Sequence, residues 1–301
     1  MNSGGMGGPA TAWWLQVHAV YQPVVDLDTR RVVGYEALAR GPRESPLHTP
    51  DALFAAARDQ GVLVELDWAC RVAALRGALT ARLPATLELF INVEPPAVSA
   101  PPPADATAIL RAATDLSIIM EITERDLTAD PAGLLRAAAG VRAHGWRIAL
   151  DDVGADPASL ALLPLLHPDV IKLDLRLVQA NTSTEVADII TAVNAHAERS
   201  GALVLAEGIE PEDQAQLAVM MGARLGQGWL FGRPAPLPPF PDTVTPPPTR
   251  PARHSPTAAA LAPAASSPAH PSPQFTPPQR RRHPTDWFKM AAAPAARPNR
   301  C

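Results

Sequence analysis

The chain has 301 residues, 47% of them apolar, so it can bury a hydrophobic core and is not disordered throughout. It contains 35 prolines, and 18 of them lie between Ala235 and Cys301. That stretch carries a net charge of +6, and because the whole chain carries −4, residues 1–234 carry −10. This acidic balance argues against nucleic acid as the main partner, since a polyanion needs a clustered basic face, and we expect no DNA partner.

The two cysteines and the N-terminal sequence allow a prediction of the cellular compartment in which the protein resides. Cys70 and Cys301 cannot form a disulfide scaffold, which is typical of a reducing compartment. The N-terminus lacks the basic and apolar regions of a leader, and no run of about 18 apolar residues occurs. We therefore expect a soluble cytoplasmic protein with no membrane span.

The composition divides the chain into three parts. Residues 1–12 are rich in glycine and are expected to be disordered. Residues 13–238 are expected to form the folded domain. Residues 239–301 are rich in proline and alanine and are basic, so we expect a disordered tail that serves as a linker or binds a protein partner as polyproline II.

The first elements are a hairpin and two helices. HAVYQPVVDL and RRVVGYEALA are β-rich runs joined at Asp28–Thr29–Arg30, which predicts a pair of strands. Pro50–Gln60 and Val64–Leu79 have apolar residues at helical spacing, with Asp51 and Asp67 near their starts. For Glu65 and Asp67, a helix cap or a solvated acid is the expected role.

Short apolar strands then alternate with helical stretches. Continuous apolar strands followed by helices predict parallel strands covered by helices, and this many units in about 220 residues favours a closed (βα) barrel over an open sheet. No glycine-rich nucleotide-binding signature follows a strand. The predicted strands are residues 87–93, 116–122, 147–153, 169–175, 202–208 and 223–232, and the helices are Pro131–His144, Pro157–Leu166, Thr184–Ser200 and Pro211–Met221.

Polar residues stand at nearly every strand end. In a βα barrel the carboxyl ends of the strands converge at one mouth. Several carboxylates at one mouth repel each other unless cations neutralise them, and oxygen ligands select Mg²⁺ or Mn²⁺. Two such ions form the clamp used to hydrolyse phosphodiesters. The residues are Glu36, Asn92, Glu121, Asp151, Asp152, Lys172, Asp174, Glu207 and Gln227.

These strand ends carry motifs that resemble the EAL domain family, named for the tripeptide at Glu36–Leu38. The resemblance spans about Val17 to Pro234 and implies a cyclic di-GMP phosphodiesterase that forms pGpG on a TIM-like (βα)8 barrel with an antiparallel first strand. The motifs, in order, are Gln22–Asp26, Gly34–Arg40, Ile91–Val93, Glu121–Glu124, Leu150–Asp152, Ile171–Asp174, Ala206–Glu210 and Gln227–Pro234.

The resemblance also implies roles for single residues. Two Mg²⁺ or Mn²⁺ ions would be held by Glu36, Asn92, Glu121, Asp151, Asp152 and Glu207. Catalytic roles would fall to Lys172, which holds or helps to deprotonate water, to Glu207, and to Glu124, which supports the loop after Asp152. Substrate contacts would come from Gln22, Leu38, Arg40, Asp174 and Gln227, with a helix start as the alternative role for Asp174. A homodimer is also implied.

One loop departs from the family pattern. Where the family usually has Phe-Gly-Thr-Gly-Tyr-Ser-Ser, this chain reads Val153–Ser159, with Ala155–Asp156–Pro157 in place of Thr-Gly-Tyr. The family's Asn-Val-Ser-Pro also has Glu94 in place of serine. Two alternatives therefore stay open: a degenerate EAL domain that binds cyclic di-GMP or a protein without turnover, and a scaffold whose tail carries the function.

Aromatic and histidine side chains receive structural interpretations. Trp229 and Phe231 are expected to pack on the barrel and not to stack on bases. The histidines at 18, 48, 144 and 167 share no spacing and are expected to be ordinary surface or boundary residues.

Overall fold

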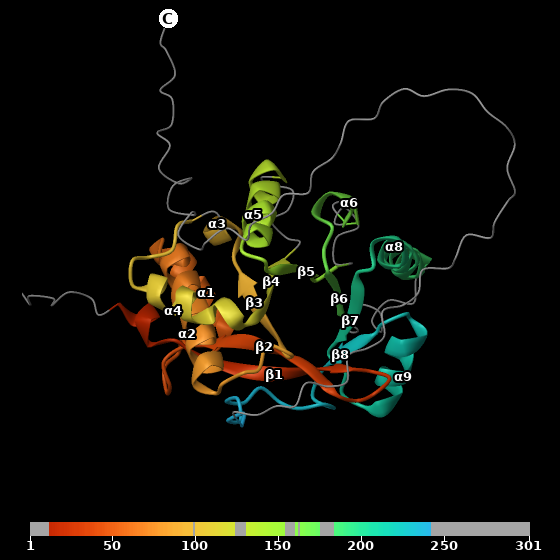
Figure 1. Cartoon of the computed structure of the whole chain (residues 1–301), viewed down its shortest axis with the longest axis horizontal. Coiled ribbons are helices and arrows are strands. Elements are labelled where there is room, and N and C mark those ends of the chain that lie inside the picture. Colours follow the sequence, from red (N-terminus) through yellow and green to blue (C-terminus); the bar gives the residue numbers. More distant parts are fainter. Residues whose placement is uncertain are drawn as a thin grey trace, which may run out of the picture.

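The computed structural model describes residues 12–98, 100–123, 131–153, 160–161, 163–174 and 184–241. Within them the strands close into one barrel in the order β1 to β8, with helices around it (Figure 1). The predicted (βα)8 barrel is therefore confirmed. The expected disorder at 1–12 and 239–301 falls outside the described residues, apart from residue 12 and residues 239–241.

The first strand runs against both of its neighbours, as predicted. β1 (His18–Asp26) pairs antiparallel with β2 (Val32–Arg40) and with β8 (Leu225–Gln227). The turn of the hairpin is held by the Asp26 carboxylate, which accepts the backbone N–H of Thr29 at 2.9 Å. The other strands pair parallel: β3 (Glu88–Val93), β4 (Ser117–Thr123), β5 (Arg147–Asp151), β6 (Val170–Asp174) and β7 (Leu203–Glu207).

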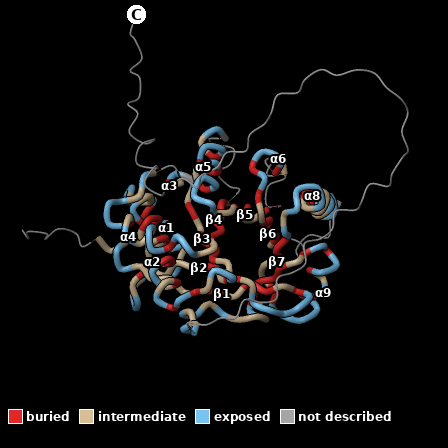
Figure 2. Tube along the Cα trace, in the orientation of Figure 1, coloured by how far each residue is buried: buried red, intermediate tan, exposed pale blue. Residues whose placement is uncertain are grey.

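Helices surround the barrel, and Figure 2 shows their buried faces turned toward the strands and their exposed faces outward. Helix α2 lies on the outer face of β1, where the Tyr21 hydroxyl donates to the Ala74 carbonyl at 2.7 Å. The chain after β8 pairs with the edge of β1, because the backbone N–H of Tyr21 donates to the Ala235 carbonyl and the N–H of Ala235 donates back to the Tyr21 carbonyl. The helices are α1 (Pro50–Gln60), α2 (Leu63–Thr80), α3 (Pro95–Val98), α4 (Ala106–Ala112), α5 (Pro131–Ala143), α6 (Leu163–Leu166), α8 (Thr184–Ser200) and α9 (Glu212–Met220), with 3₁₀ turns at Trp13–Gln16 and Ala113–Asp115.

An apolar layer fills the inside of the barrel beneath its mouth. Strands β1 and β3 to β8 each contribute one side chain that is 5% exposed or less, and Val33 of β2 packs against them. Side chains alternate between the two faces of a strand, so the residue two positions nearer the mouth shares this inner face. The layer consists of Val24, Phe90, Ile119, Ala149, Val170, Leu205 and Leu225.

Helix α2 corrects one expectation from the sequence. Asp67 lies inside the helix, 2% exposed, and forms an ion pair with Arg71 one turn later. Its Oδ1 accepts the backbone N–H of Glu94 at 2.8 Å, and Arg71 donates to the carbonyl of Ala97 at 3.1 Å. The interpretation of Asp67 as a cap or a solvated acid is wrong, because this pair anchors the segment after β3.

Two further points complete the fold. Of the helix expected at Pro157–Leu166, Leu163–Leu166 is α-helical and residues 160–161 are 3₁₀-helical, while residues 157–159 and 162 lie outside the described part of the chain. Among the described helices, none is long and apolar enough to cross a membrane.

Candidate active site

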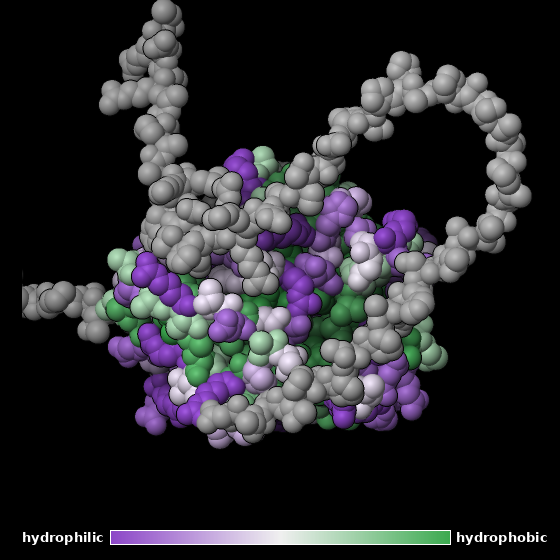
Figure 3. Space-filling view, in the orientation of Figure 1, coloured by the Kyte–Doolittle hydropathy of each residue, from purple (hydrophilic) through white to green (hydrophobic). Residues whose placement is uncertain are grey.

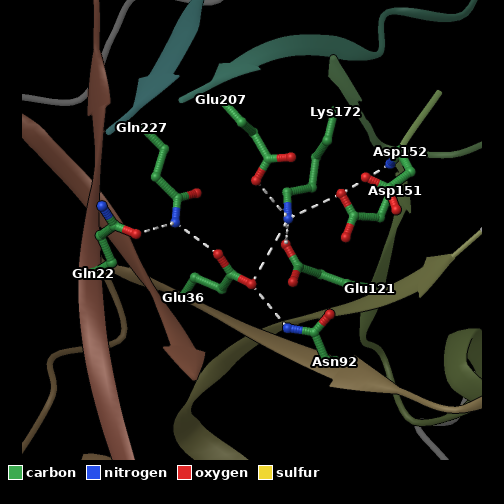
Figure 4. A network of polar contacts seen from close by, with 9 residues as sticks. All are labelled: Gln22, Glu36, Asn92, Glu121, Asp151, Asp152, Lys172, Glu207 and Gln227. Atoms are coloured by element: carbon green, nitrogen blue, oxygen red, sulfur yellow. Dashed lines mark hydrogen bonds and ion pairs between the residues drawn. The ribbon is translucent and has the colours of Figure 1, made fainter. Parts of the chain in front are cut away.

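The polar strand-end residues meet at the mouth, as Figure 4 shows. Most of them lie two positions beyond a member of the apolar layer, so strand alternation turns them inward: Asn92 follows Phe90, Glu121 follows Ile119, and Lys172 follows Val170. On the antiparallel β1 the order is reversed, and Gln22 precedes Val24. The alternation that packs the barrel floor therefore also aims these side chains into one cluster.

Lys172 lies at the centre of the cluster. Its Nζ is 2.7 Å from Glu121 Oε1, 3.0 Å from Glu207 Oε1 and 3.2 Å from Asp151 Oδ1. A fourth carboxylate, that of Glu36, lies 3.8 Å away. One ammonium thus faces carboxylates from four different strands.

Amide side chains orient Glu36. Asn92 Nδ2 donates to Glu36 Oε1 at 2.8 Å, and Gln227 Nε2 donates to Glu36 Oε2 at 2.6 Å. Gln227 Nε2 also lies 3.3 Å from Gln22 Oε1, and Gln22 Nε2 donates to the carbonyl of Gly232 at 3.0 Å. Both carboxylate oxygens of Glu36 therefore accept hydrogen bonds from amide side chains that the sequence analysis predicted at strand ends.

Burial and the excess of carboxylates shift the pKa values of the ionisable side chains in the cluster. Burial, together with the charges of neighbouring carboxylates, raises the pKa of Glu121 well above its usual value. Burial also raises the pKa of Glu207 to about 8, although Lys172 opposes that shift. Burial alone would lower the pKa of Lys172, but the surrounding carboxylates outweigh it and raise that pKa well above the usual value. The ammonium is accordingly charged at neutral pH.

The end of β5 has an unusual backbone. Asp152 has a φ of +56°, in the left-handed region that few residues other than glycine enter. Its N–H bonds to the Asp151 carboxylate at 3.0 Å, which holds the two aspartates side by side. Lys172 and this hydrogen bond help to lower the pKa of Asp151 although burial opposes them.

The donor set fits hard cations. Glu121 is fully buried, and its Oε2 has no hydrogen-bond partner among the described residues. A buried carboxylate oxygen without a partner is costly unless a cation compensates it. In the described residues no three acid, histidine or cysteine side chains are already spaced to hold a metal ion, and the Lys172 ammonium lies among the carboxylates.

The remaining predicted residues fall at different distances from this cluster. Leu38 and Arg40 follow Glu36 on β2, and Asp174 lies opposite Glu207 in the sheet register. Glu124 and the loop residues Ala155–Asp156–Pro157 lie outside the described residues.

The sequence interpretation missed three features. Trp229 is 52% exposed, and the Arg233 guanidinium lies 3.9 Å from its ring centroid. The expectation that Trp229 packs on the barrel is therefore wrong. Phe231, in contrast, does pack against the core.

His18 and His48 are neighbours, with ring centroids 6.0 Å apart. Sequence spacing could not reveal that contact, but the spacing of Asp67 and Arg71 four residues apart could have signalled a helix pair.

A (βα)8 barrel with an antiparallel first strand and an acidic mouth defines the class of the fold. The chain belongs to the EAL domain family, whose model matches residues 15–234. The resemblance stated from the motifs is thereby confirmed.

Two curated relatives and one solved structure are similar to the chain. It is 32% identical over 235 residues to the probable cyclic di-GMP phosphodiesterase PdeN of Escherichia coli, covering 75% of this chain and 45% of PdeN. It is 32% identical over 228 residues to the cyclic di-GMP phosphodiesterase RocR of Pseudomonas aeruginosa, covering 73% of this chain and 58% of RocR. The manganese and cyclic di-GMP complex of BlrP1 from Klebsiella pneumoniae matches with a TM-score of 0.62 and 30% identity, over 73% of this chain and 56% of BlrP1. The match thus covers about half of each of these proteins.

Proposed function

We propose that the barrel hydrolyses cyclic di-GMP to pGpG with the help of divalent cations. One observation carries the proposal: carboxylates from β2, β4, β5 and β7 gather around Lys172 at the mouth, within 3.8 Å of its Nζ. Such an excess of buried acid suits phosphoryl transfer with cations and is unfavourable without them. RocR is described as a cyclic di-GMP phosphodiesterase and PdeN as a probable one, which supports the choice of substrate.

Two ions, Mg²⁺ or Mn²⁺, would be held by Glu36, Asn92, Glu121, Asp151, Asp152 and Glu207. When bound, they would activate water and neutralise charge on the phosphate. Manganese is present with the cyclic dinucleotide in the BlrP1 complex, which supports this cofactor class.

Lys172 and Glu207 would act on the attacking water. Lys172 would hold the attacking water or help to deprotonate it, because an ammonium among carboxylates and metal ions can position hydroxide. Glu207 lies 3.0 Å from Lys172 and keeps 20% of its side chain exposed, so it can exchange a proton with solvent at the mouth. Glu124 would support the loop after Asp152.

The substrate would lie along the inner wall of the mouth. Gln22 and Gln227 are held beside Glu36, and the Arg40 guanidinium would contact a phosphate, for which its planar fork is suited. Leu38 and Asp174 complete the proposed contacts.

The test is conversion of cyclic di-GMP to pGpG, followed by chromatography, with Mg²⁺ or Mn²⁺. Glu36→Ala removes an acceptor of two hydrogen bonds, and Glu65→Ala, on the exposed face of α2, is the matched control. We expect product from the wild type and the control and none from Glu36→Ala. Binding without product from the wild type would overturn hydrolysis in favour of a cyclic di-GMP receptor, and absence of both would favour the scaffold.

The other expectations remain proposals. We take residues 13–238 as the functional unit, and the half-buried, free thiol of Cys70 supports a cytoplasmic location. A homodimer and a protein partner for the tail remain predictions, the first from the family resemblance and the second from proline content.

A further inference from the structure

The carboxyl end of β3 is paired further along one side than along the other. In the sheet register β3 pairs with β2 as far as Ile91 and with β4 as far as Val93. Asn92, whose Nδ2 donates to Glu36 Oε1 at 2.8 Å, therefore lies beyond the last residue of β3 that β2 holds. A side chain in such a place keeps its orientation only if other contacts fix the backbone that carries it.

Two helices supply these contacts through Glu94, the first residue after β3. The backbone N–H of Glu94 donates to Asp67 Oδ1 of α2 at 2.8 Å. The carboxylate of Glu94 accepts Arg58 Nη2 of α1 on both of its oxygens, at 3.2 Å and 3.1 Å. The main chain and the side chain of Glu94 are thus both tied to helices outside the barrel, two residues from Asn92.

The ion pair between Arg58 and Glu94 depends on a departure from the family pattern. The family usually has serine where this chain has Glu94, and serine offers no carboxylate to an arginine. The pair lies at the surface, with 54% of the Arg58 side chain and 23% of the Glu94 side chain exposed. Figure 3 shows hydrophilic side chains interspersed with hydrophobic ones over the described surface in view. An exposed ion pair contributes little to the stability of a fold, so either partner can be replaced without unfolding the chain.

We infer that Glu94 is a positioning residue for the cation site. Its contacts with Arg58 and Asp67 fix the end of β3. Asn92, two residues earlier, is thereby held in the orientation in which it meets Glu36 and would meet a cation. Groups that orient metal ligands change metal affinity although they do not touch the metal. The inference rests on the proposed function, because it assumes that divalent cations bind at the acidic cluster.

The test measures the Kd of Mn²⁺ alone, from the electron paramagnetic resonance signal of the free ion. Glu94→Gln and Arg58→Gln both break the ion pair, but they change the net charge in opposite directions. Charge alone would make Arg58→Gln bind Mn²⁺ more tightly, whereas positioning predicts weaker binding in both variants. We expect each of them to raise Kd by about 2- to 5-fold. The double variant keeps the net charge of the wild type and should bind like the single variants, because the contact is already lost in each.

A matched control lies at the other end of the same strand. Glu88, the first residue of β3, forms an ion pair with Arg147, and its side chain is 25% exposed against 23% for Glu94. Arg147→Gln should therefore bind Mn²⁺ like the wild type. Urea denaturation in EDTA should show similarly small losses of stability in Arg147→Gln and Arg58→Gln, so a difference in Kd reports on the cation site.

Three results would overturn the inference. They are an unchanged or lower Kd in Arg58→Gln, an equal rise of Kd in Arg147→Gln, and additive effects in the double variant. A loss of stability in Arg58→Gln without a change in Kd would leave the ion pair a structural role only. Failure of the wild type to bind Mn²⁺ would instead overturn the proposed function, and the inference with it.

Discussion

The ammonium of Lys172 lies 2.7 Å from a carboxylate oxygen of Glu121, with 1% and 0% of the two side chains exposed. Three further carboxylates surround the same ammonium, so the cluster holds more negative than positive charge when all of them are ionised. Lys172 thus offsets part of the negative charge of these carboxylates, and we propose that divalent cations offset the rest.

Removal of this counter-ion should destabilise the protein. We expect Lys172→Met to lower the free energy of unfolding by about 3–5 kcal/mol without metal, because buried carboxylates lose their partner. Addition of Mn²⁺ should restore part of the loss. Urea denaturation with and without metal measures both, with Arg76→Met as the exposed control. A variant as stable as the wild type without metal would contradict the role of Lys172 as counter-ion.

The raised pKa of Glu207 predicts a pH dependence of stability in the cation-free protein. Its pKa is about 8 in the folded chain against 4.5 for the ordinary carboxyl, so between these values the folded state binds a proton that the unfolded state releases. This contribution is fully present below the unfolded pKa and is lost as pH rises through the folded pKa. We expect this contribution to lower stability in EDTA between about pH 5 and about pH 8, and Glu207→Gln to flatten the fall. A rise in wild-type stability over that range would refute the shift.

The ion pair between Asp67 and Arg71, which anchors the segment after β3, should be essential for stability. Asp67→Ala leaves the Arg71 guanidinium buried without its carboxylate and removes the acceptor of the Glu94 N–H. We expect a loss of about 3–5 kcal/mol in the free energy of unfolding, measured by urea denaturation. Glu65→Ala, two residues earlier on the exposed face, should change it by less than about 0.5 kcal/mol. Equal effects of the two variants would contradict the anchoring role.

The loop after Asp152 offers a gain-of-function test. Ala155→Thr with Asp156→Gly restores the residues that the family usually carries there. If this loop limits turnover, the double variant should raise kcat several-fold. No change in kcat would indicate that the natural loop already supports the reaction.

The barrel and its polar mouth could be predicted because both depend on local patterns. Short apolar segments such as residues 147–153, each followed by a segment with apolar residues at helical spacing, predict parallel strands covered by helices. Polar residues at the ends of such strands must converge when the strands close into a barrel. The alternation that buries Phe90 and Ile119 in the floor also turns Asn92 and Glu121 toward the mouth.

Contacts between distant segments could not be predicted in the same way. His18 and His48 meet only because the loop after β2 folds back at Gly41, and no periodicity reports that approach. The sequence also placed Lys172 at a strand end without showing that it takes the central position among four carboxylates. That position follows from the closure of the barrel, which depends on the register of all its strands.

The most direct measurement of the central claim is the metal dependence of product formation. Purified protein incubated with cyclic di-GMP should release pGpG in Mg²⁺ or Mn²⁺, stop in EDTA and resume when metal is restored. Product that forms at the same rate in EDTA, or in the Glu36→Ala variant, would contradict a reaction carried by the acidic cluster around Lys172.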